Sequence, residues 1–190
     1  GYMKDFMPLD FPSTLGGDFA GVVKELGEGV SEFKVGEEIY GSANVFSGGS
    51  GSFAEFASAK TRNVAIKPKN SSFEEAAALP LVGSSAVQAL DEHINLQRGQ
   101  KILIHGGAGG IGHIAIQLAK ALGAYVATTV SADVKDFVKQ LGADEVVDYK
   151  LQKFDEILKD FYAVFDTVGG EITNRSFKTL KKGGVLVSMV

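Results

Sequence analysis

The sequence predicts an α/β protein in which a doubly wound parallel sheet follows a small all-β unit. From Lys101 onward, short apolar segments alternate with stretches of helical period, and this alternation requires parallel strands joined by right-handed crossovers. From about residue 15 to residue 67 the segments are short, β-like and separated by glycine. We therefore expect two domains, one over residues 1–74 and one over residues 75–190.

The first domain suits a small barrel or a partly open sheet. Turn signals lie at Gly27-Glu28-Gly29 and within the Gly- and Ser-rich residues 47–51. Between these signals, four segments have strand character, and the strands we expect cover residues 20–26, 37–40, 52–59 and 63–66.

A helical connection follows the first domain. Ser72 and Glu75 have the spacing of a capping box, which predicts a helix start before the alanine-rich residues 76–79. Pro80 and Gly83 should break that run, so we expect a second helix over residues 84–93.

In the second domain, strands and helices are expected in strict alternation. The predicted strands cover residues 101–105, 124–129, 145–148, 162–166 and 184–189. The predicted helices cover residues 110–122, 133–141, 154–159 and 171–180.

A glycine cluster joins the first of these strands to the first helix. Gly107, Gly109 and Gly112 satisfy G-x-G-x-x-G in the strand–turn–helix context of the dinucleotide-binding (Rossmann) fingerprint. Glycine permits the tight turn and lets the backbone approach a pyrophosphate, and the helix start offers free N–H groups. The alternative is an ordinary turn between a strand and a helix.

Composition and charge exclude several classes of function. The formal net charge of −4 argues against a surface for nucleic acid or anionic membranes. The absence of cysteine excludes disulfides, thiolate metal sites and a cysteine nucleophile. No apolar stretch reaches the ~18 residues of a membrane span. Cytoplasm is the default compartment, and we expect it here. Because the chain begins at Gly1 and stops in an apparent strand, we also expect an internal fragment.

An ordered set of motifs resembles the zinc-free quinone oxidoreductase branch of the medium-chain dehydrogenase/reductase superfamily. The similarity covers nearly the whole chain, in the family's order. Its motifs are Leu15-Gly-Gly-Asp-Phe-Ala-Gly21, Val35-Gly-Glu-Glu-Ile-Tyr-Gly41, Glu75-Ala-Ala-Ala-Leu-Pro80, Ala108-Gly-Gly-Ile-Gly112, Leu141-Gly-Ala-Asp144 and Asp166-Thr-Val-Gly-Gly170. The resemblance implies part of a GroES-like β-barrel catalytic domain before the Rossmann domain, and a homodimer at full length.

The chain departs from the zinc members of that superfamily. They carry a histidine before an acidic residue, where this chain has Gly17-Asp18. His93, His105 and His113 are scattered along the sequence, and we interpret each as an ordinary surface or core histidine. We therefore expect no metal. Asp18 is either an acidic residue near the cleft or a turn residue that fixes backbone N–H groups.

The choice of cofactor is visible at the end of the second predicted strand. NAD-binding domains place an Asp or Glu there, roughly 20 residues past the glycines, to bind the ribose 2′-hydroxyl. This chain has Val130, and then Ser131 and Lys135, which suit the extra phosphate of NADP. By resemblance, Tyr149 should flank that phosphate and the adenine. Alternatively, Ser131 is an N-cap, Lys135 a solvated helix residue and Tyr149 a surface residue.

The remaining predicted contacts lie along the dinucleotide. Backbone near the glycines should meet the pyrophosphate, Ser85 should face the nicotinamide by resemblance, and Val168 lies at the carboxyl edge of the sheet. Alternatively, Ser85 is an ordinary helix hydroxyl and Val168 a turn residue. The full set of predicted cofactor contacts is Ser85, Ala108, Gly109, Gly110, Ile111, Ser131, Lys135, Tyr149 and Val168.

The resemblance implies an enzyme that uses NADP(H) to reduce quinones or activated C=C bonds of a small-molecule substrate. The catalytic residues are not evident, and Tyr2 and Tyr40, although near the expected cleft, more readily serve packing. Two alternatives stay open. One is a non-catalytic NADPH-binding sensor or scaffold, since a fold does not fix a function. The other is a reductase of enoyl thioesters.

Overall fold

The structure is a computed structural model that describes residues 8–190. The chain divides into two compact units, Gly1–Leu81 and Val82–Val190. The boundary expected between residues 74 and 75 stays a prediction, because a compact unit and a functional domain need not divide at the same residue.

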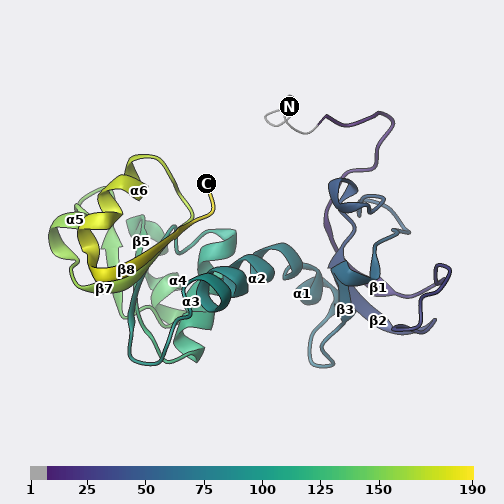
Figure 1. Cartoon of the computed structure of the whole chain (residues 1–190), viewed down its shortest axis with the longest axis horizontal. Coiled ribbons are helices and arrows are strands. Elements are labelled where there is room, and N and C mark those ends of the chain that lie inside the picture. Colours follow the sequence, from purple (N-terminus) through teal and green to yellow (C-terminus); the bar gives the residue numbers. More distant parts are fainter. Residues whose placement is uncertain (1–7) are drawn as a thin grey trace. The chain divides into compact units, whose positions relative to one another are not determined.

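The first unit contains a three-stranded antiparallel sheet. Its order is β1-β2-β3, from Asp18–Val22, Glu38–Ser42 and Val64–Ile66, as Figure 1 shows. Two 3-10 turns, η1 (Val45–Ser47) and η2 (Thr61–Asn63), lie in its connections.

The strand expected over residues 52–59 is wrong. That segment forms bends, in which the Phe53 N–H donates to the Leu15 carbonyl at 2.9 Å. The Ser58 N–H donates to the Ser50 hydroxyl at 2.8 Å. Phe53 and Phe56 are both exposed, and their spacing of three residues would send them to opposite faces of a strand. The segment therefore has no common apolar face that could hold it in a sheet.

The capping box at the end of the first unit is confirmed. The Ser72 N–H donates to the Glu75 carboxylate at 2.8 Å, and the Glu75 N–H donates to the Ser72 hydroxyl at 3.1 Å. Helix α1 spans Phe73–Ala77.

The second helix begins earlier than expected. Helix α2 spans Pro80–Val87 and continues as a π-helix, η3, over Gln88–His93. Pro80 thus starts a helix as well as ending the previous one, because a proline at the first helical position needs no backbone donor. Gly83 lies inside α2 and does not break it.

The second unit is the predicted doubly wound sheet. Five parallel strands have the order β6-β5-β4-β7-β8. In chain order they are β4 (Lys101–His105), β5 (Tyr125–Val130), β6 (Glu145–Asp148), β7 (Phe161–Asp166) and β8 (Leu180–Ser188). The expected bounds hold for β4 and β6, whereas β8 begins four residues before the predicted start.

The helices between these strands are α3 (Gly110–Ala121), α4 (Lys135–Gln140), α5 (Phe154–Ile157) and α6 (Glu171–Ser176). All four are shorter than expected: α3 ends one residue and α5 two residues before the predicted end, and in α4 and α6 3-10 turns take part of the segment. These turns are η4 (Ala132–Val134), before α4, and η5 (Phe177–Thr179), after α6.

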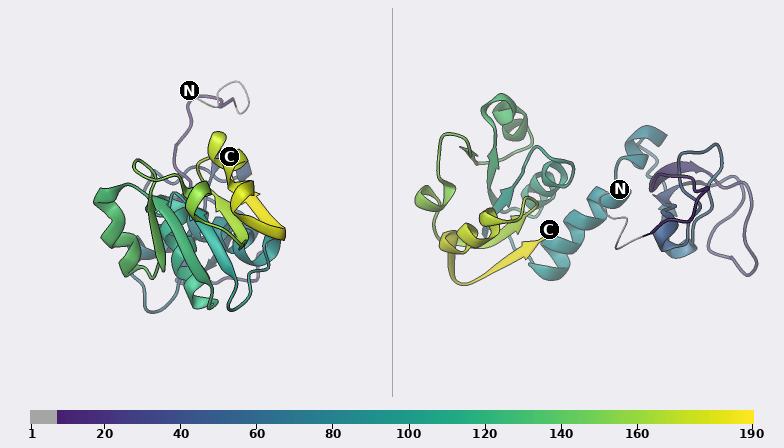
Figure 2. Two further views of the ribbon diagram at one scale, coloured as in Figure 1. Left: turned by 90° about the vertical axis from the view of Figure 1, so that its left-hand side faces the viewer. Right: turned by 90° about the horizontal axis from the view of Figure 1, so that it is seen from above.

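Helices lie on both faces of the parallel sheet (Figure 2). Side chains of β4 alternate between them: Ile102 and Ile104 pack with α3, and Leu103 packs with Phe154 of α5. All three side chains are fully buried. With both faces covered, the carboxyl ends of the strands are the part of the sheet open to a ligand.

Candidate functional site

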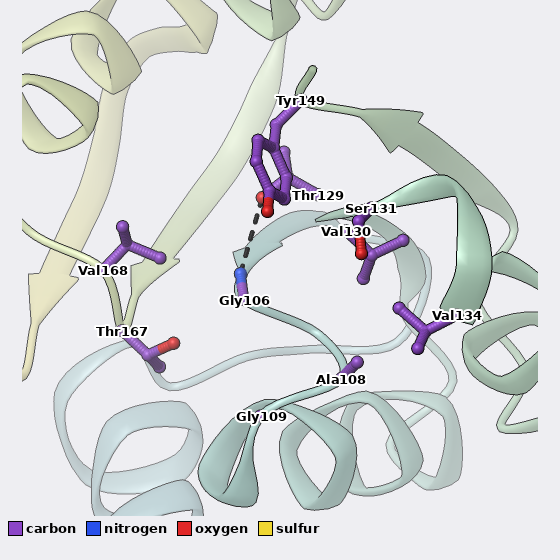
Figure 3. A pocket seen from close by; sticks show the side chains of 10 residues that line it. All are labelled: Gly106, Ala108, Gly109, Thr129, Val130, Ser131, Val134, Tyr149, Thr167 and Val168. Atoms are coloured by element: carbon purple, nitrogen blue, oxygen red, sulfur yellow. Dashed lines mark hydrogen bonds between the residues drawn. The ribbon is translucent and has the colours of Figure 1, made fainter. Parts of the chain in front are cut away.

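A pocket with a cavity volume of about 270 Å³ lies at the carboxyl edge of the parallel sheet. Its lining comes from the segments that follow β4, β5, β6 and β7, as Figure 3 shows. The lining residues are Gly106, Ala108, Gly109, Thr129, Val130, Ser131, Val134, Tyr149, Thr167 and Val168. The strand order reverses between β4 and β7, which is where open α/β sheets bind ligands.

The structure brings some of the predicted contact residues into this pocket and leaves others outside its lining. Those in the lining are Ala108, Gly109, Ser131, Tyr149 and Val168. Outside the lining, Gly110 and Ile111 are the first two residues of α3 and directly follow Gly109. Ser85 is buried on α2, and Lys135, half-buried, is the first residue of α4.

The turn after β4 presents backbone N–H groups. Gly106 has a φ of +68°, and the Gly109 N–H donates to its carbonyl at 2.8 Å. The His113 N–H then donates to the Gly109 carbonyl at 3.1 Å as the first helical bond of α3. The N–H groups of Gly110, Ile111 and Gly112 therefore precede the helical ladder, at the positive end of the helix dipole.

The glycines of the turn have different physical roles. A Cβ at Gly112 would lie 2.2 Å from the Gly106 carbonyl oxygen, and one at Gly107 would lie 2.0 Å from the Thr128 hydroxyl. At Gly110, by contrast, a Cβ would meet only Val82 Cγ1, at an ordinary 3.5 Å. Packing within the protein thus requires glycine at 107 and 112 but not at 110.

The end of β5 has the residues expected there, but with an additional acid beside them. Val130 is the last residue of β5 and is buried against the pocket. The Ser131 hydroxyl is hydrogen-bonded to the exposed carboxylate of Asp133, and this bond is the main reason that the pKa of Asp133 lies below its ordinary value. Ser131 occupies the N-cap position of η4 but makes no side-chain cap bond. Lys150, which sequence reasoning did not single out, acts on Asp133 as a nearby positive charge.

Asp166 orders the loop that carries Val168. Its carboxylate accepts the N–H groups of Val168 at 2.9 Å and Gly169 at 3.0 Å, and the Thr173 hydroxyl at 2.5 Å. Burial raises the pKa of this carboxyl, but the hydrogen bonds outweigh burial and leave its pKa below the ordinary value.

His105 is the most perturbed group beside the pocket. It is fully buried at the end of β4, with Nδ1 2.9 Å from the Thr129 hydroxyl and Nε2 2.9 Å from the Ser176 hydroxyl. Burial lowers the pKa of His105 to about 4, against a smaller opposite effect of Asp166. The interpretation as an ordinary core histidine overlooked this contact with a pocket residue, because Thr129 and Ser176 are distant in the sequence.

The other residues named from the sequence lie outside this pocket. The Asp18 carboxylate accepts the Leu81 N–H at 3.1 Å, so it does fix a backbone N–H, although one far along the chain. Tyr40 is half-buried in β2, His93 is exposed, and His113 Nδ1 lies 2.9 Å from the Gly109 carbonyl. Tyr2 lies outside the described residues.

Two wider features can be stated for residues 8–190. No three histidine or acidic side chains gather there as a possible metal site. Within the same range, every helix is too short or too polar to cross a membrane.

The buried His105 predicts an acid-labile fold. Between pH 6.5 and about 4 the unfolded chain binds a proton that the folded chain does not, so stability is lost as the pH falls through that window. The loss due to His105 should reach on the order of 3 kcal/mol near pH 4. Urea unfolding at several pH values, for the unmodified chain and for His105→Phe, measures it. Identical pH slopes for both proteins would contradict the assignment.

Comparison with known proteins agrees with this architecture. Residues 2–69 match the alcohol dehydrogenase GroES-like domain, and residues 110–189 match the zinc-binding dehydrogenase family. The chain is 41% identical over 183 residues to 2-methylene-furan-3-one reductase of Solanum lycopersicum, covering 93% of this chain and 46% of that protein. It thus spans about half the length of the curated relatives it matches. Other relatives have chloroplast or mitochondrial names.

Solved structures show the same relationship. The quinone oxidoreductase of Coxiella burnetii matches with a TM-score of 0.82 and 37% identity, over 98% of this chain and 57% of that one. The quinone oxidoreductase of Escherichia coli, solved with NADPH, matches with a TM-score of 0.81 and 31% identity, over 98% and 59%. With a GroES-like domain followed by a doubly wound nucleotide-binding sheet, the chain belongs to the medium-chain dehydrogenase/reductase superfamily, beside its quinone and alkenal oxidoreductases.

Proposed function

We propose that the protein is a zinc-independent, NADPH-dependent oxidoreductase that reduces quinones or C=C bonds activated by a carbonyl group. The observation that carries this proposal is the pocket itself, where a glycine turn, a helix N-terminus and a valine in place of the NAD-type acid meet at the strand-order reversal. Two of the relatives named above support the proposal. One is named a 2-methylene-furan-3-one reductase, and the other is a quinone oxidoreductase solved with NADPH.

The residues of the turn fit a dinucleotide pyrophosphate. Gly109 has the extended backbone of an N-cap without a side chain, so the N–H groups of Gly110 and Ile111 are open to an anion. At Gly110 the absence of a side chain would let the phosphates approach the backbone. The pocket volume of about 270 Å³ is smaller than that of most small-molecule sites, so it holds only part of the cofactor. Ala108, Gly109, Gly110 and Ile111 would therefore hold the pyrophosphate.

The two ends of the cofactor take the other predicted contacts. Tyr149, exposed beside Val130, would flank the adenine, with Ser131 and Lys135 at the 2′-phosphate. The phosphate would take the Ser131 hydroxyl from Asp133, whose exposed side chain can turn to solvent. Val168 and Ser85 would lie toward the nicotinamide.

The chemistry expected of this chain is positioning. The bound nicotinamide supplies the hydride, and the protein orients it against the acceptor. The pocket lining contains no carboxylate and no histidine. The hydroxyls of Thr129 and Thr167 are already hydrogen-bonded to His105, and those of Ser131 and Tyr149 are proposed for the cofactor, so we assign no proton donor among these residues. The sequence has no cysteine, so no zinc–thiolate site can assist hydride transfer in this chain.

Two properties of the whole protein belong to the same proposal. A homodimer follows from the resemblance. Placement in the cytoplasm is the default expectation, whereas some relatives carry names of other compartments.

The proposed activity is tested by NADPH oxidation with the full-length protein against quinones, 2-alkenals and enoyl thioesters. We expect turnover of the first two classes and no loss of rate with chelators. Preference for enoyl thioesters would favour a thioester reductase. Tight NADPH binding without turnover of any acceptor would favour a sensor or scaffold.

The end of β5 should control the choice between NADPH and NADH. Val130→Asp places a negative charge near the 2′-phosphate and should weaken NADPH binding by at least about tenfold, while NADH binding is little changed. Val130→Asn has the same shape without the charge and serves as the matched control. Equal dissociation constants of the unmodified protein for both cofactors would refute the predicted preference.

The glycines of the turn should separate binding from folding. Gly110→Val should abolish NADPH binding but leave the thermal midpoint nearly unchanged, because its Cβ would make only an ordinary contact, at 3.5 Å with Val82 Cγ1. Gly112→Ala should instead destabilise the fold by about 1–3 kcal/mol, because the turn backbone must move. Calorimetric titration and thermal unfolding measure the two effects. Unchanged NADPH affinity in folded Gly110→Val would mean that the cluster is only a turn.

A further inference from the structure

We propose that His105 is a positioning residue for the pocket: its neutral imidazole, protonated at Nε2, orients Thr129 and thereby holds the start of the glycine turn. The role of the turn in cofactor binding rests on the function proposed above. The hydrogen-bond chain through His105 does not, because it lies within the protein.

The protonation state follows from the partners of the two ring nitrogens. The Ser176 hydroxyl donates its one proton to the Ile172 carbonyl at 2.6 Å. It can therefore only accept from His105 Nε2, 2.9 Å away, so Nε2 carries the proton. In a neutral ring Nδ1 is then an acceptor, and the Thr129 hydroxyl, 2.9 Å away, donates to it. In this arrangement each donor of the hydrogen-bond series from Thr129 through His105 and Ser176 to Ile172 has an acceptor.

Thr129 passes this orientation to the turn. Its hydroxyl oxygen accepts the Gly106 N–H at 3.4 Å, the contact drawn in Figure 3, and its carbonyl accepts the Gly107 N–H at 3.3 Å. Without an acceptor at Nδ1, the hydroxyl would rotate to find another partner and weaken the first of these bonds. The ring of His105 thus determines how the backbone leaves β4.

The backbone of the same residue contacts the opposite wall of the pocket. The His105 carbonyl accepts the Thr167 hydroxyl at 2.8 Å, and Thr167 lines the pocket after β7. His105, at the end of β4, therefore contacts the ends of two further strands, β5 through Thr129 and β7 through Thr167. Its Nε2 also contacts α6 through the Ser176 hydroxyl. The Thr167 contact uses the backbone carbonyl and needs no histidine, whereas the contacts with Thr129 and Ser176 require the imidazole.

The surroundings keep the imidazole neutral. Phe154 of α5 lies edge-on to the ring, with centroids 4.6 Å apart, and the Arg175 guanidinium of α6 lies over the Phe154 ring at 4.8 Å. Asp155 pairs with Arg175, so the carboxylate that faces His105 most directly is Asp166 of β7. Burial and the Arg175 charge together outweigh Asp166, consistent with a donor at one nitrogen only.

Two substitutions separate positioning from space filling. His105→Phe keeps the ring volume but has no acceptor for Thr129. His105→Asn leaves a cavity but can place its amide oxygen near the position of Nδ1. The exposed His93, changed to Phe, is the matched control. The measurements are hydrogen exchange of the Gly106 and Gly107 amides, the dissociation constant for NADPH, and thermal stability, all with the full-length protein.

We expect exchange at Gly106, whose N–H donates to the Thr129 hydroxyl, to quicken, and NADPH affinity to fall, by about tenfold in His105→Phe. In His105→Asn both should stay close to the unmodified values, although its thermal stability falls. Nitrogen NMR of the unmodified protein should show a protonated Nε2 and an unprotonated Nδ1.

A proton on Nδ1 would overturn the proposal. It would also be overturned if, in both variants, NADPH affinity and the protection of the amides from hydrogen exchange fell in proportion to thermal stability. If the unmodified protein does not bind NADPH, the proposed function fails. Amide exchange in the same variants still decides whether His105 positions the turn.

Discussion

The contact between the glycine turn and the first turn of α3 is the constraint on which the site depends. Because Gly112 has no side chain, the helix can approach the Gly106 carbonyl, where even a Cβ would come within 2.2 Å. This close approach directs the helix N-terminus toward the carboxyl edge of the sheet. The start of α3 therefore follows directly on Gly109, which lines the pocket together with residues of β5 and of the segments after β6 and β7.

Much of the fold was predictable because it depends on local patterns. The bounds of β4 and β6 agree with the predicted bounds, and the Ser72–Glu75 capping box forms as its spacing indicates. The errors arise where local signals are ambiguous. Residues 52–59 have strand-like composition without an apolar face, and Pro80 can end one helix while starting the next.

The site was predictable only in outline. Position relative to a strand end is enough to place Ala108, Ser131 and Val168 at one edge of the sheet, where they line the pocket, because parallel strands end at one edge. Their contacts with a cofactor stay a prediction. The sequence contains no sign that the Ser131 hydroxyl is bonded to Asp133, or that His105 meets Thr129. Such contacts depend on side-chain rotamers and on residues brought together by the fold. A buried, strand-terminal histidine beside a glycine turn was nevertheless a signal that could have been weighed.

Whether a carboxylate at the end of β5 excludes the 2′-phosphate of NADP depends on where that carboxylate is held as much as on its presence. A carboxylate at Val130 would be fixed by the strand and buried, where its charge is poorly screened. Asp133 stands three residues later on a 3-10 turn, exposed to water, where its charge is screened and its side chain can turn away. Lys135 at the start of α4 and Lys150 supply positive charge near Asp133, and Asp136 and Asp148 add negative charge beside these lysines. Under the proposed function, an acid fixed at position 130 would exclude a 2′-phosphate, whereas Asp133 would permit it.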